Sequence, residues 1–197
     1  MPDDSPSAGA ALNAKSQRLR EHLRSLGRVL VAYSGGADSA FLAWVAYREL
    51  GDRMMAVLAD SPSLARSQMQ DAVAFAQEQN IPLEIIQTAE MERPEYRKND
   101  GARCFHCKDE LFTVMEGFRE KRGFDVIAYG VNRDDQGDYR PGQQAARQHG
   151  VAAPLLDADL TKQDIRDLAR EAGLRIWDKP ASACLSSRIE YGRPVTA

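Results

Sequence analysis

The stretch Ser34-Gly35-Gly36-Ala37-Asp38-Ser39 decides the fold that we expect for this chain. An apolar run at residues 28–33 comes directly before it, and an apolar run with helical spacing, residues 40–50, follows. A strand, a tight turn and a helix N-terminus form an anion site, because the first amides of a helix lack internal partners and its dipole is positive there. Two glycines let the backbone approach a phosphate, and Ser34 and Ser39 add hydroxyl donors. The pattern predicts a nucleotide phosphate site, with an ordinary structural turn as the alternative.

The glycine pattern separates this loop from two other phosphate-binding motifs. The glycines are adjacent and no lysine follows, so neither G-x-G-x-x-G nor G-x-x-x-x-G-K-[ST] matches. The string S-G-G-x-D-S after an apolar strand resembles the signature of the PP-loop ATP pyrophosphatases. That resemblance implies that ATP adenylates a carbonyl or carboxylate oxygen, and that a nitrogen or sulfur nucleophile then displaces AMP. It also implies a catalytic Asp38 and nucleotide contacts from the strand end and the loop: Ala32, Ser34, Gly35, Gly36, Asp38 and Ser39.

Strand-like apolar runs alternate with helical patterns along the rest of the chain. We expect strands at residues 28–33, 54–59, 83–87 and 125–129, and helices at residues 19–26, 40–50, 64–79, 110–121, 141–149 and 162–172. Ser63 and Thr161 are the expected caps of the third and the last of these helices. Repeated βα units predict an α/β fold, a doubly wound and mostly parallel sheet of the PP-loop type, with ligands beyond the carboxyl ends of the strands.

Composition sets the class of protein. Residues 15–197 are enough for one domain, and residues 1–14, rich in Pro, Ser, Asp and Ala, are expected to form a mobile tail. A net charge of −3 argues against a nucleic-acid partner. The absence of a long apolar run or a signal peptide predicts a cytoplasmic protein without membrane contact. Three cysteines, an odd number, favour a metal or catalytic use over a disulfide framework.

Polar residues follow the second and fourth expected strands. Asp60 and Ser61 end the second, where a carboxylate would meet the ribose or the adenine edge, although the same residues are good turn formers. Gly130 and Asn132 follow the fourth and suit a loop beside the nucleotide. Both pairs are therefore candidate nucleotide-binding residues.

Two further residues of the fourth loop are candidates for binding charge. Asp134 belongs to an acidic pair that offers oxygen ligands to Mg²⁺, with a solvated acidic loop as the competing interpretation. Arg140 precedes a helix and has the fork geometry to bind a substrate phosphate or carboxylate, with a structured turn as the alternative.

The cysteines form a C-x-x-C pair, Cys104 and Cys107, and a distant third, Cys184. This arrangement supports redox, zinc or iron–sulfur interpretations. Three thiolates hold a [4Fe–4S] cluster with one iron open to an exogenous ligand, which would suit sulfur delivery. Cys184 has polar neighbours that resemble oxyanion or phosphate partners: Ser186, Ser187 and Arg188.

Together these motifs, at residues 34–39, 60–62, 103–108, 132–142 and 183–188, resemble the LarE family. Its members are ATP-dependent sulfur transferases of nickel-pincer nucleotide cofactor biosynthesis, and the likeness runs from residue 19 to the end. The resemblance implies that Mg²⁺ and ATP adenylate a carboxylate of pyridinium-3,5-biscarboxylic acid mononucleotide, a small-molecule nucleotide. A sulfur nucleophile displaces AMP to give a thiocarboxylate, and a second round treats the other carboxylate.

The resemblance leaves two sulfur sources open. In one, the residue matching Cys184 attacks the acyl-adenylate, and its carbon–sulfur bond then breaks to leave dehydroalanine. In the other, Cys104, Cys107 and Cys184 hold a [4Fe–4S] cluster that carries an extra sulfide; all three cysteines are present, which favours this form. Ser186 and Arg188 would assist catalysis, and Ser187, Arg188 and Arg140 would bind substrate. The resemblance also implies a homo-hexamer and a further C-terminal segment, so we expect that a chain ending at residue 197 has an incomplete site.

Three rival functions start from the same loop. A PP-loop tRNA thiolation enzyme predicts a basic face and an RNA-binding appendage. An amidating synthetase, such as NAD or GMP synthetase, explains the loop but leaves the cysteines without a role. A non-catalytic nucleotide-binding domain would use the cysteines for structural zinc.

Overall fold

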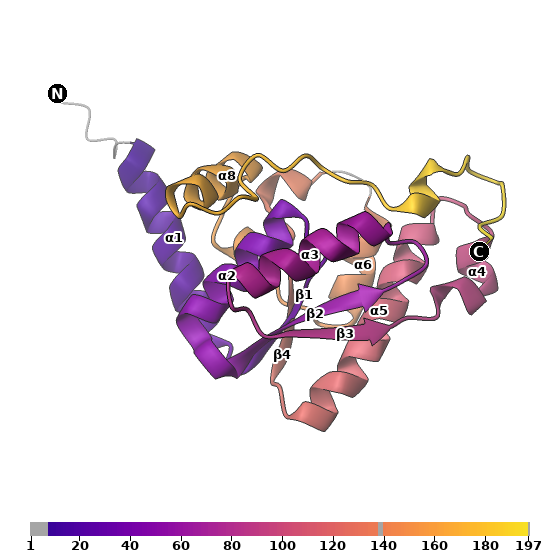
Figure 1. The fold of residues 1–197 in the computed structure, drawn as a ribbon, viewed down its shortest axis with the longest axis horizontal. Helices are drawn as coiled ribbons and strands as arrows, with labels where there is room; N and C mark the ends of the chain where they lie inside the picture. Colours follow the sequence, from indigo (N-terminus) through magenta and orange to yellow (C-terminus); the bar gives the residue numbers. More distant parts are fainter. Residues whose placement is uncertain (1–7, 138–139, 197) are drawn as a thin grey trace.

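The computed structural model describes residues 8–137 and 140–196. At its centre is a sheet of four parallel strands in the order β3-β2-β1-β4 (Figure 1), which confirms the expected doubly wound α/β fold. The strands are β1 (Val29–Ala32), β2 (Met54–Asp60), β3 (Leu83–Gln87) and β4 (Val126–Tyr129). The helices are α1 (Ala8–Ser25), α2 (Ala37–Leu50), α3 (Arg66–Glu78), α4 (Pro94–Arg97), α5 (Arg103–Arg122), α6 (Pro141–Gln148), α7 (Pro154–Asp157) and α8 (Lys162–Glu171).

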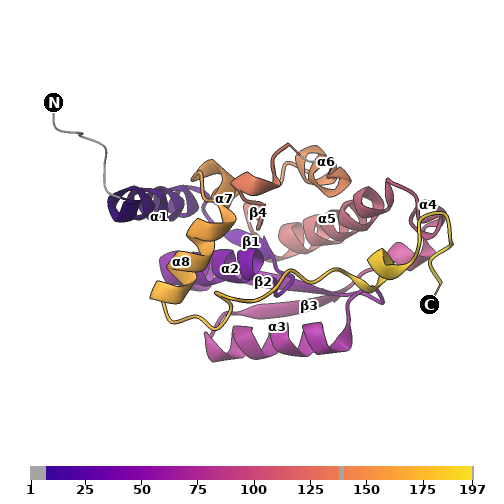
Figure 2. The same cartoon turned by 90° about the horizontal axis from the view of Figure 1, so that it is seen from above.

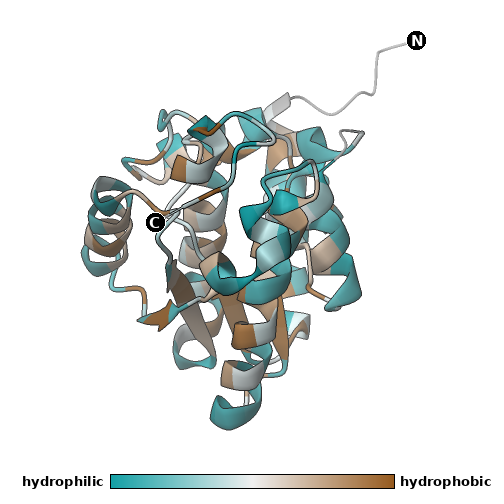
Figure 3. Ribbon diagram, turned by 90° about the vertical axis from the view of Figure 1, so that its right-hand side faces the viewer, coloured by the Kyte–Doolittle hydropathy of each residue, from teal (hydrophilic) through white to brown (hydrophobic). Residues whose placement is uncertain are grey.

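Successive residues of each strand face opposite layers of helices. On β1, Val29 and Val31 pack with α1, α2, α3 and α8, whereas Leu30 and Ala32 pack with α5 and α6. Figure 2 places α3 on one side of the sheet and α5 and α6 on the other. Because both faces are covered, the strands are continuous apolar runs, seen as brown ribbons inside the more hydrophilic helices in Figure 3.

The N-terminal helix begins earlier than composition predicts. The tail was expected to reach residue 14, but α1 starts at Ala8, and residues 1–7 lie outside the described part. Alanine favours helix, and Leu12, Leu19 and Leu23 pack in the core, which extends the helix. Although α1 and α5 are the long helices, within the described ranges none combines the length and apolarity needed to span a bilayer.

Two other helix starts also differ from expectation. α5 begins at Arg103 rather than at residue 110, so the C-x-x-C pair lies on a helix and not in a loop. α3 begins at Arg66 without a side-chain cap, because Ala65 occupies the N-cap position; the expected cap, Ser63, lies two residues earlier and bonds to Tyr96 and Ser186. α4 and α7 were not expected; each is one turn long and has proline in its first turn.

The start of α8 confirms the expected cap. The Thr161 hydroxyl accepts from the Asp164 amide at 3.1 Å, and the Asp164 carboxylate accepts from the Thr161 amide at 2.9 Å. This reciprocal pair satisfies two amides at the helix N-terminus. It therefore fixes the position of Lys162, the first residue of α8.

The strand order places a crevice beside the end of β1. β2 and β4 flank β1, so the connections after β1 and β4 leave the sheet on opposite sides. Gly130, just after β4, lies directly against the first turn of α2. A Cβ at residue 130 would stand 2.7 Å from the Ser39 amide nitrogen and 2.9 Å from its Cα, so only glycine fits there.

His149, Asp109 and Glu116 form an ionic clamp that joins α5 and α6 on their side of the sheet. His149, which follows α6, places Nε2 2.9 Å from Asp109 Oδ1 and Nδ1 3.0 Å from Glu116 Oε1. Burial lowers the pKa of His149, but hydrogen bonds to the two carboxylates outweigh it and raise that pKa above the ordinary value. Arg93 also reaches Asp109, at 2.8 Å, so the carboxylate joins three elements.

We expect Gly130→Ala to destabilise the fold by about 1–3 kcal/mol, because the new methyl group clashes with the backbone of Asp38 and Ser39 in the first turn of α2. Gly117→Ala, in the middle of α5 with no atom within 4 Å of its Cβ, is the matched control and should stabilise by about 0.5–1 kcal/mol. Urea unfolding of both variants measures the difference. Equal stability of the Gly130→Ala variant and the unmodified chain would contradict the close approach.

We expect His149→Gln to cost more stability at pH 6 than at pH 9. A histidine whose pKa is raised on folding stabilises fully below its unfolded value, about 6.5. That stabilisation is lost as the pH rises through the raised folded value. Urea unfolding of both chains at the two pH values gives the two differences. A difference that does not depend on pH would show that the clamp works without a charged imidazole.

Candidate active site

A cavity of about 780 Å³ opens beyond the carboxyl ends of β1, β2 and β4. It joins the loop after β1, the first turns of α5 and the segment that carries the third cysteine. The expected site residues that line it are Ala32, Ser34, Gly36, Asp38, Ser39, Ser61, Cys104, Cys107, Gly130, Arg140 and Cys184. The fold thus brings the predicted phosphate loop and the three cysteines to one cavity.

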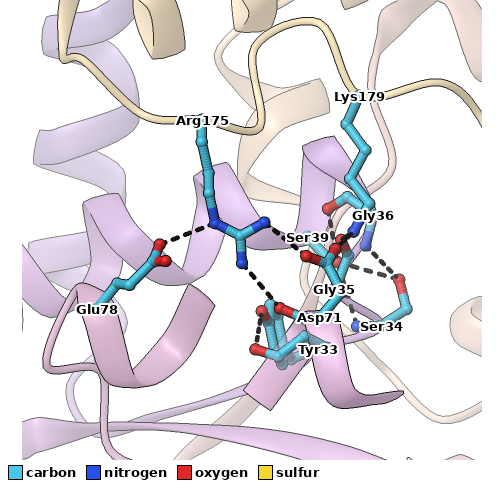
Figure 4. Close-up of polar contacts among 10 residues, drawn as sticks. Tyr33, Ser34, Gly35, Gly36, Ser39, Asp71, Glu78, Arg175 and Lys179 are labelled. Carbon is cyan, nitrogen blue, oxygen red and sulfur yellow. Dashed lines mark hydrogen bonds and ion pairs between the residues drawn. The ribbon is translucent and has the colours of Figure 1, made fainter. Parts of the chain in front are cut away.

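The loop after β1, residues 34–36, is closed by its own serines (Figure 4). The Ser34 amide donates to Ser39 Oγ at 3.2 Å, and Ser39 Oγ donates to the Gly36 carbonyl at 3.1 Å. Gly36 is the N-cap of α2 and offers no capping side chain. No side chain caps the first amides of α2, and Gly36, Asp38 and Ser39 line the cavity, an arrangement that suits an anion. Gly35 has φ +73°, and a Cβ there would be 2.5 Å from Ala72 Cβ.

Asp38, the acidic residue of this loop, is held by a lysine that the sequence did not reveal. Lys162 Nζ lies 2.7 and 2.8 Å from the two carboxylate oxygens of Asp38. Burial raises the pKa of Asp38, the pairing with Lys162 opposes that rise, and the nearby Asp135 adds to it. A lysine beside a helix N-terminus suits the binding of phosphate.

The loop after β4 uses its acidic pair differently from expectation. Asp134, the expected Mg²⁺ ligand, is exposed and accepts from the Lys162 amide at 2.8 Å, so it caps α8 and does not line the cavity. Asn132 is buried and caps the turn at residues 133–135. Asp135 lines the cavity instead and pairs with Arg140 at 2.6 Å. Residues 138 and 139 of this loop lie outside the described residues.

Of the two expected site residues at the end of β2, Asp60 and Ser61, only Ser61 lines the cavity. Its hydroxyl donates to the buried Glu90. Asp60 pairs with Arg66 at 2.5 Å and accepts from Gln87 at 3.0 Å, and it lines a separate hollow of about 390 Å³. The expected nucleotide contact from Asp60 is therefore not placed in the main cavity.

The three cysteines face the cavity from two segments. Cys104 and Cys107 lie in the first two turns of α5, and Cys184 directly precedes a short 3-10 turn. Cys104 and Cys184 are exposed, whereas Cys107 is half-buried. Burial raises the pKa of the Cys107 thiol to about 11; Lys108 opposes the rise, and Glu90 and the other two cysteines add to it. The three thiols are thus electrostatic neighbours.

This set of donors suits an iron–sulfur cluster in its chemistry: three thiols on one cavity, with no fourth cysteine in the chain. Nevertheless, in the described part of the chain no three or more His, Cys, Asp or Glu side chains are gathered closely enough to hold a metal ion. The structure thus places the three thiols on one cavity, and the expected cluster stays a prediction.

The polar residues after Cys184 do not line the cavity, contrary to expectation. Ser186 is buried, and its hydroxyl lies 2.8 Å from Ser63 Oγ and 2.7 Å from the Tyr96 hydroxyl. Ser187 Oγ donates to the Cys184 carbonyl at 2.6 Å, and Arg188 is exposed. Ser186 and Ser187 thus make contacts within and behind the turn that follows Cys184, and the substrate contacts expected of the three residues stay a prediction.

Arg103, next to the first cysteine, is a site residue that sequence reasoning missed. It is buried, lines the cavity and donates to the Ser186 carbonyl at 2.7 Å and to Asn99 Oδ1 at 2.5 Å. Asn99 is also buried and donates to the Glu190 carbonyl at 2.9 Å. Arg103 therefore fixes the Cys184 segment against the start of α5. An arginine preceding a cysteine carries no sequence signal for such a role.

Known proteins share both the sequence and the fold. The sequence profile of the family described as NAD synthase matches residues 12–115. A protein of unknown function from Synechocystis is 43% identical over 94% of this chain and 69% of its own length. The pyridinium-3,5-bisthiocarboxylic acid mononucleotide synthase of Lactiplantibacillus plantarum is 31% identical over 95% of this chain and 68% of its own length.

A solved structure gives the same fold independently. The NH₃-dependent NAD synthetase of Campylobacter jejuni superimposes with a TM-score of 0.65 at 16% identity, over 83% of this chain and 74% of that one. The phosphate loop, the parallel sheet and these likenesses agree: the chain belongs to the NAD synthase family of PP-loop proteins, and the pyridinium-3,5-bisthiocarboxylic acid mononucleotide synthase of Lactiplantibacillus plantarum is a relative of it.

Proposed function

We propose that this protein is an ATP-dependent sulfur transferase that converts pyridinium-3,5-biscarboxylic acid mononucleotide to its thiocarboxylate forms through an acyl-adenylate. The observation that carries the proposal is one cavity with a phosphate loop on one wall and three thiols on another. The likeness to the Lactiplantibacillus synthase supports the choice of substrate.

The phosphate loop would serve the first half-reaction. A carboxylate oxygen of the substrate attacks the α-phosphorus of ATP, and the bond from that phosphorus to the pyrophosphate oxygen breaks. The amides of α2 and the Lys162 ammonium would bind the departing pyrophosphate, because the helix N-terminus is positive and Lys162 is held beside it by Asp38, which lines the cavity. Mg²⁺ accompanies ATP and neutralises part of its charge. Asp38 and Asp135 are the carboxylates on this side of the cavity.

A thiol would serve the second half-reaction. The Cys184 thiolate attacks the acyl carbon, and the bond from carbon to the AMP oxygen breaks, giving a thioester. Loss of the Cα proton to solvent and cleavage of the Cβ–S bond then leave dehydroalanine and a thiocarboxylate. Cys184 is exposed within the cavity, which gives it the access that a nucleophile needs.

The alternative source of sulfur is a [4Fe–4S] cluster on Cys104, Cys107 and Cys184, whose open iron would supply a bound sulfide as the nucleophile. The chemistry of the three thiols favours this source, and it would spare the protein chain. Iron, sulfide and zinc analysis of protein purified without oxygen tests it. Zinc without iron, together with full activity of the Cys104→Ala variant, would contradict the cluster.

An amidating synthetase is the second candidate, since the superimposed structure is an NAD synthetase. The three cavity-lining thiols favour sulfur transfer, because amidation gives them no role. Ammonia-dependent AMP release without any thiocarboxylate would support amidation instead.

We expect Asp38→Ala to lower adenylation at least about 100-fold, because it removes the partner that holds Lys162 in the phosphate loop. Pyrophosphate exchange into ATP, dependent on the pyridinium dicarboxylate, measures this step alone. Asp167→Ala is the control, since Asp167 pairs with Arg170 on the outer face of α8. Normal exchange by the Asp38→Ala variant would refute the role of the loop aspartate.

We expect Cys184→Ala to keep adenylation and lose sulfur transfer. The thiol lies away from the phosphate loop in sequence, and its removal leaves that loop intact. Mass spectrometry detects the thiocarboxylate, and the exchange assay is the internal control. Intact mass of the unmodified chain after turnover separates the two sources, since the sacrificial route lowers the mass by one H₂S. Thiocarboxylate formation by the Cys184→Ala variant would exclude both routes.

A further inference from the structure

A lysine between α8 and Cys184 reaches back to the phosphate loop. Lys179 Nζ donates to the Gly35 carbonyl at 2.9 Å and pairs with Asp71 on α3 (Figure 4). Its side chain is only 20% exposed. Three elements that are distant in the sequence therefore meet at one ammonium group.

The carboxylate on which Lys179 rests is itself fixed. Arg175 Nη1 lies 2.5 Å from Asp71 Oδ1, Arg175 Nη2 donates to the Asp71 carbonyl at 3.1 Å, and Arg175 Nε reaches Glu78 at 2.8 Å. Hydrogen bonding to Lys179, and then to Arg175, lowers the pKa of Asp71 against the opposing effect of burial, so the carboxylate stays charged at neutral pH. An ion pair with Asp71 on α3 thus holds the Lys179 ammonium in the place from which it donates to the Gly35 carbonyl.

The contact with Gly35 controls the direction of an amide. The Gly35 carbonyl and the Gly36 N–H belong to one planar trans peptide and point to opposite sides. Holding the carbonyl toward Lys179 therefore turns the Gly36 N–H away from it and toward the Ser34 hydroxyl, to which it donates at 3.4 Å; Ser34 and Gly36 both line the cavity. Glycine at residue 35 has little intrinsic preference for this orientation, so the lysine supplies a preference that the residue lacks.

We propose that Lys179 is a positioning residue that orients the Gly35–Gly36 peptide for phosphate. The inference rests on the proposed function for the identity of the loop ligand.

Pyrophosphate binding, measured by calorimetry with inorganic pyrophosphate and Mg²⁺, tests this inference. We expect Lys179→Met to raise Kd by about tenfold, the loss of one charge-assisted contact. Lys179→Arg, which keeps a charged donor, should restore most of the affinity. Arg175→Met is the matched control, because Arg175 shares Asp71 but does not touch the loop, and it should change Kd by less than about twofold.

Thermal unfolding of the three variants separates positioning from stability. If Lys179→Met binds pyrophosphate as the unmodified protein does, or if Arg175→Met loses as much affinity with the same fall in Tm, the proposed positioning role is wrong. An unmodified chain that binds no pyrophosphate would instead overturn the proposed function, and this inference with it.

Discussion

The arrangement of the candidate site depends on the N-terminus of α2, which lies at the cavity and has no side-chain cap. α2 starts at the end of β1, and its N-cap is a glycine. The unsatisfied amides favour a negative charge at that point, and the surrounding residues accommodate one. Gly130 leaves room beside the first turn, Lys162 stands on one side and Lys179 holds the loop from the other.

Three cationic side chains near the start of α2 are each paired with a carboxylate when no ligand is bound. Lys162 is paired with Asp38, Arg140 with Asp135, and Lys179 with Asp71. A phosphate that binds here exchanges one partner of a cation for another, so no cation needs to lie unpaired in a partly buried place. This pairing also explains why the acidic composition of the chain says little about its affinity for an anion.

The strands of the sheet could be predicted from the sequence because the pattern that marks a strand lies within a few consecutive residues. Each strand is a short apolar run, and the cap at Thr161 is read within four residues. The start of α5 was missed because residues 103–109 are mostly polar and show no apolar stripe; packing against α6 is what keeps this end helical. The pair between Asp38 and Lys162 spans 124 positions and has no local signature.

Residue types identified the candidate site better than they identified the direction of each side chain. The cysteines and the loop serines reach the cavity as expected. Ser186 has the chemistry of a substrate-binding hydroxyl, but its buried partners Ser63 and Tyr96 turn it inward. Asp60 is likewise taken by Arg66. The direction of such a side chain depends on which hydrogen-bond partner lies nearest in the folded chain, and the sequence does not show which residues become neighbours.

The turn that follows Cys184 is held mainly by polar contacts, through Arg103, Asn99 and the Leu185 amide, which donates to the Ser63 carbonyl at 2.9 Å. Most side chains between residues 177 and 191 are exposed. Segments with few buried apolar contacts open locally at a lower free energy than the whole domain. Hydrogen exchange in this segment should therefore be faster than in β1, because the Cys184 wall of the cavity opens at a lower free energy than the wall formed by the loop after β1.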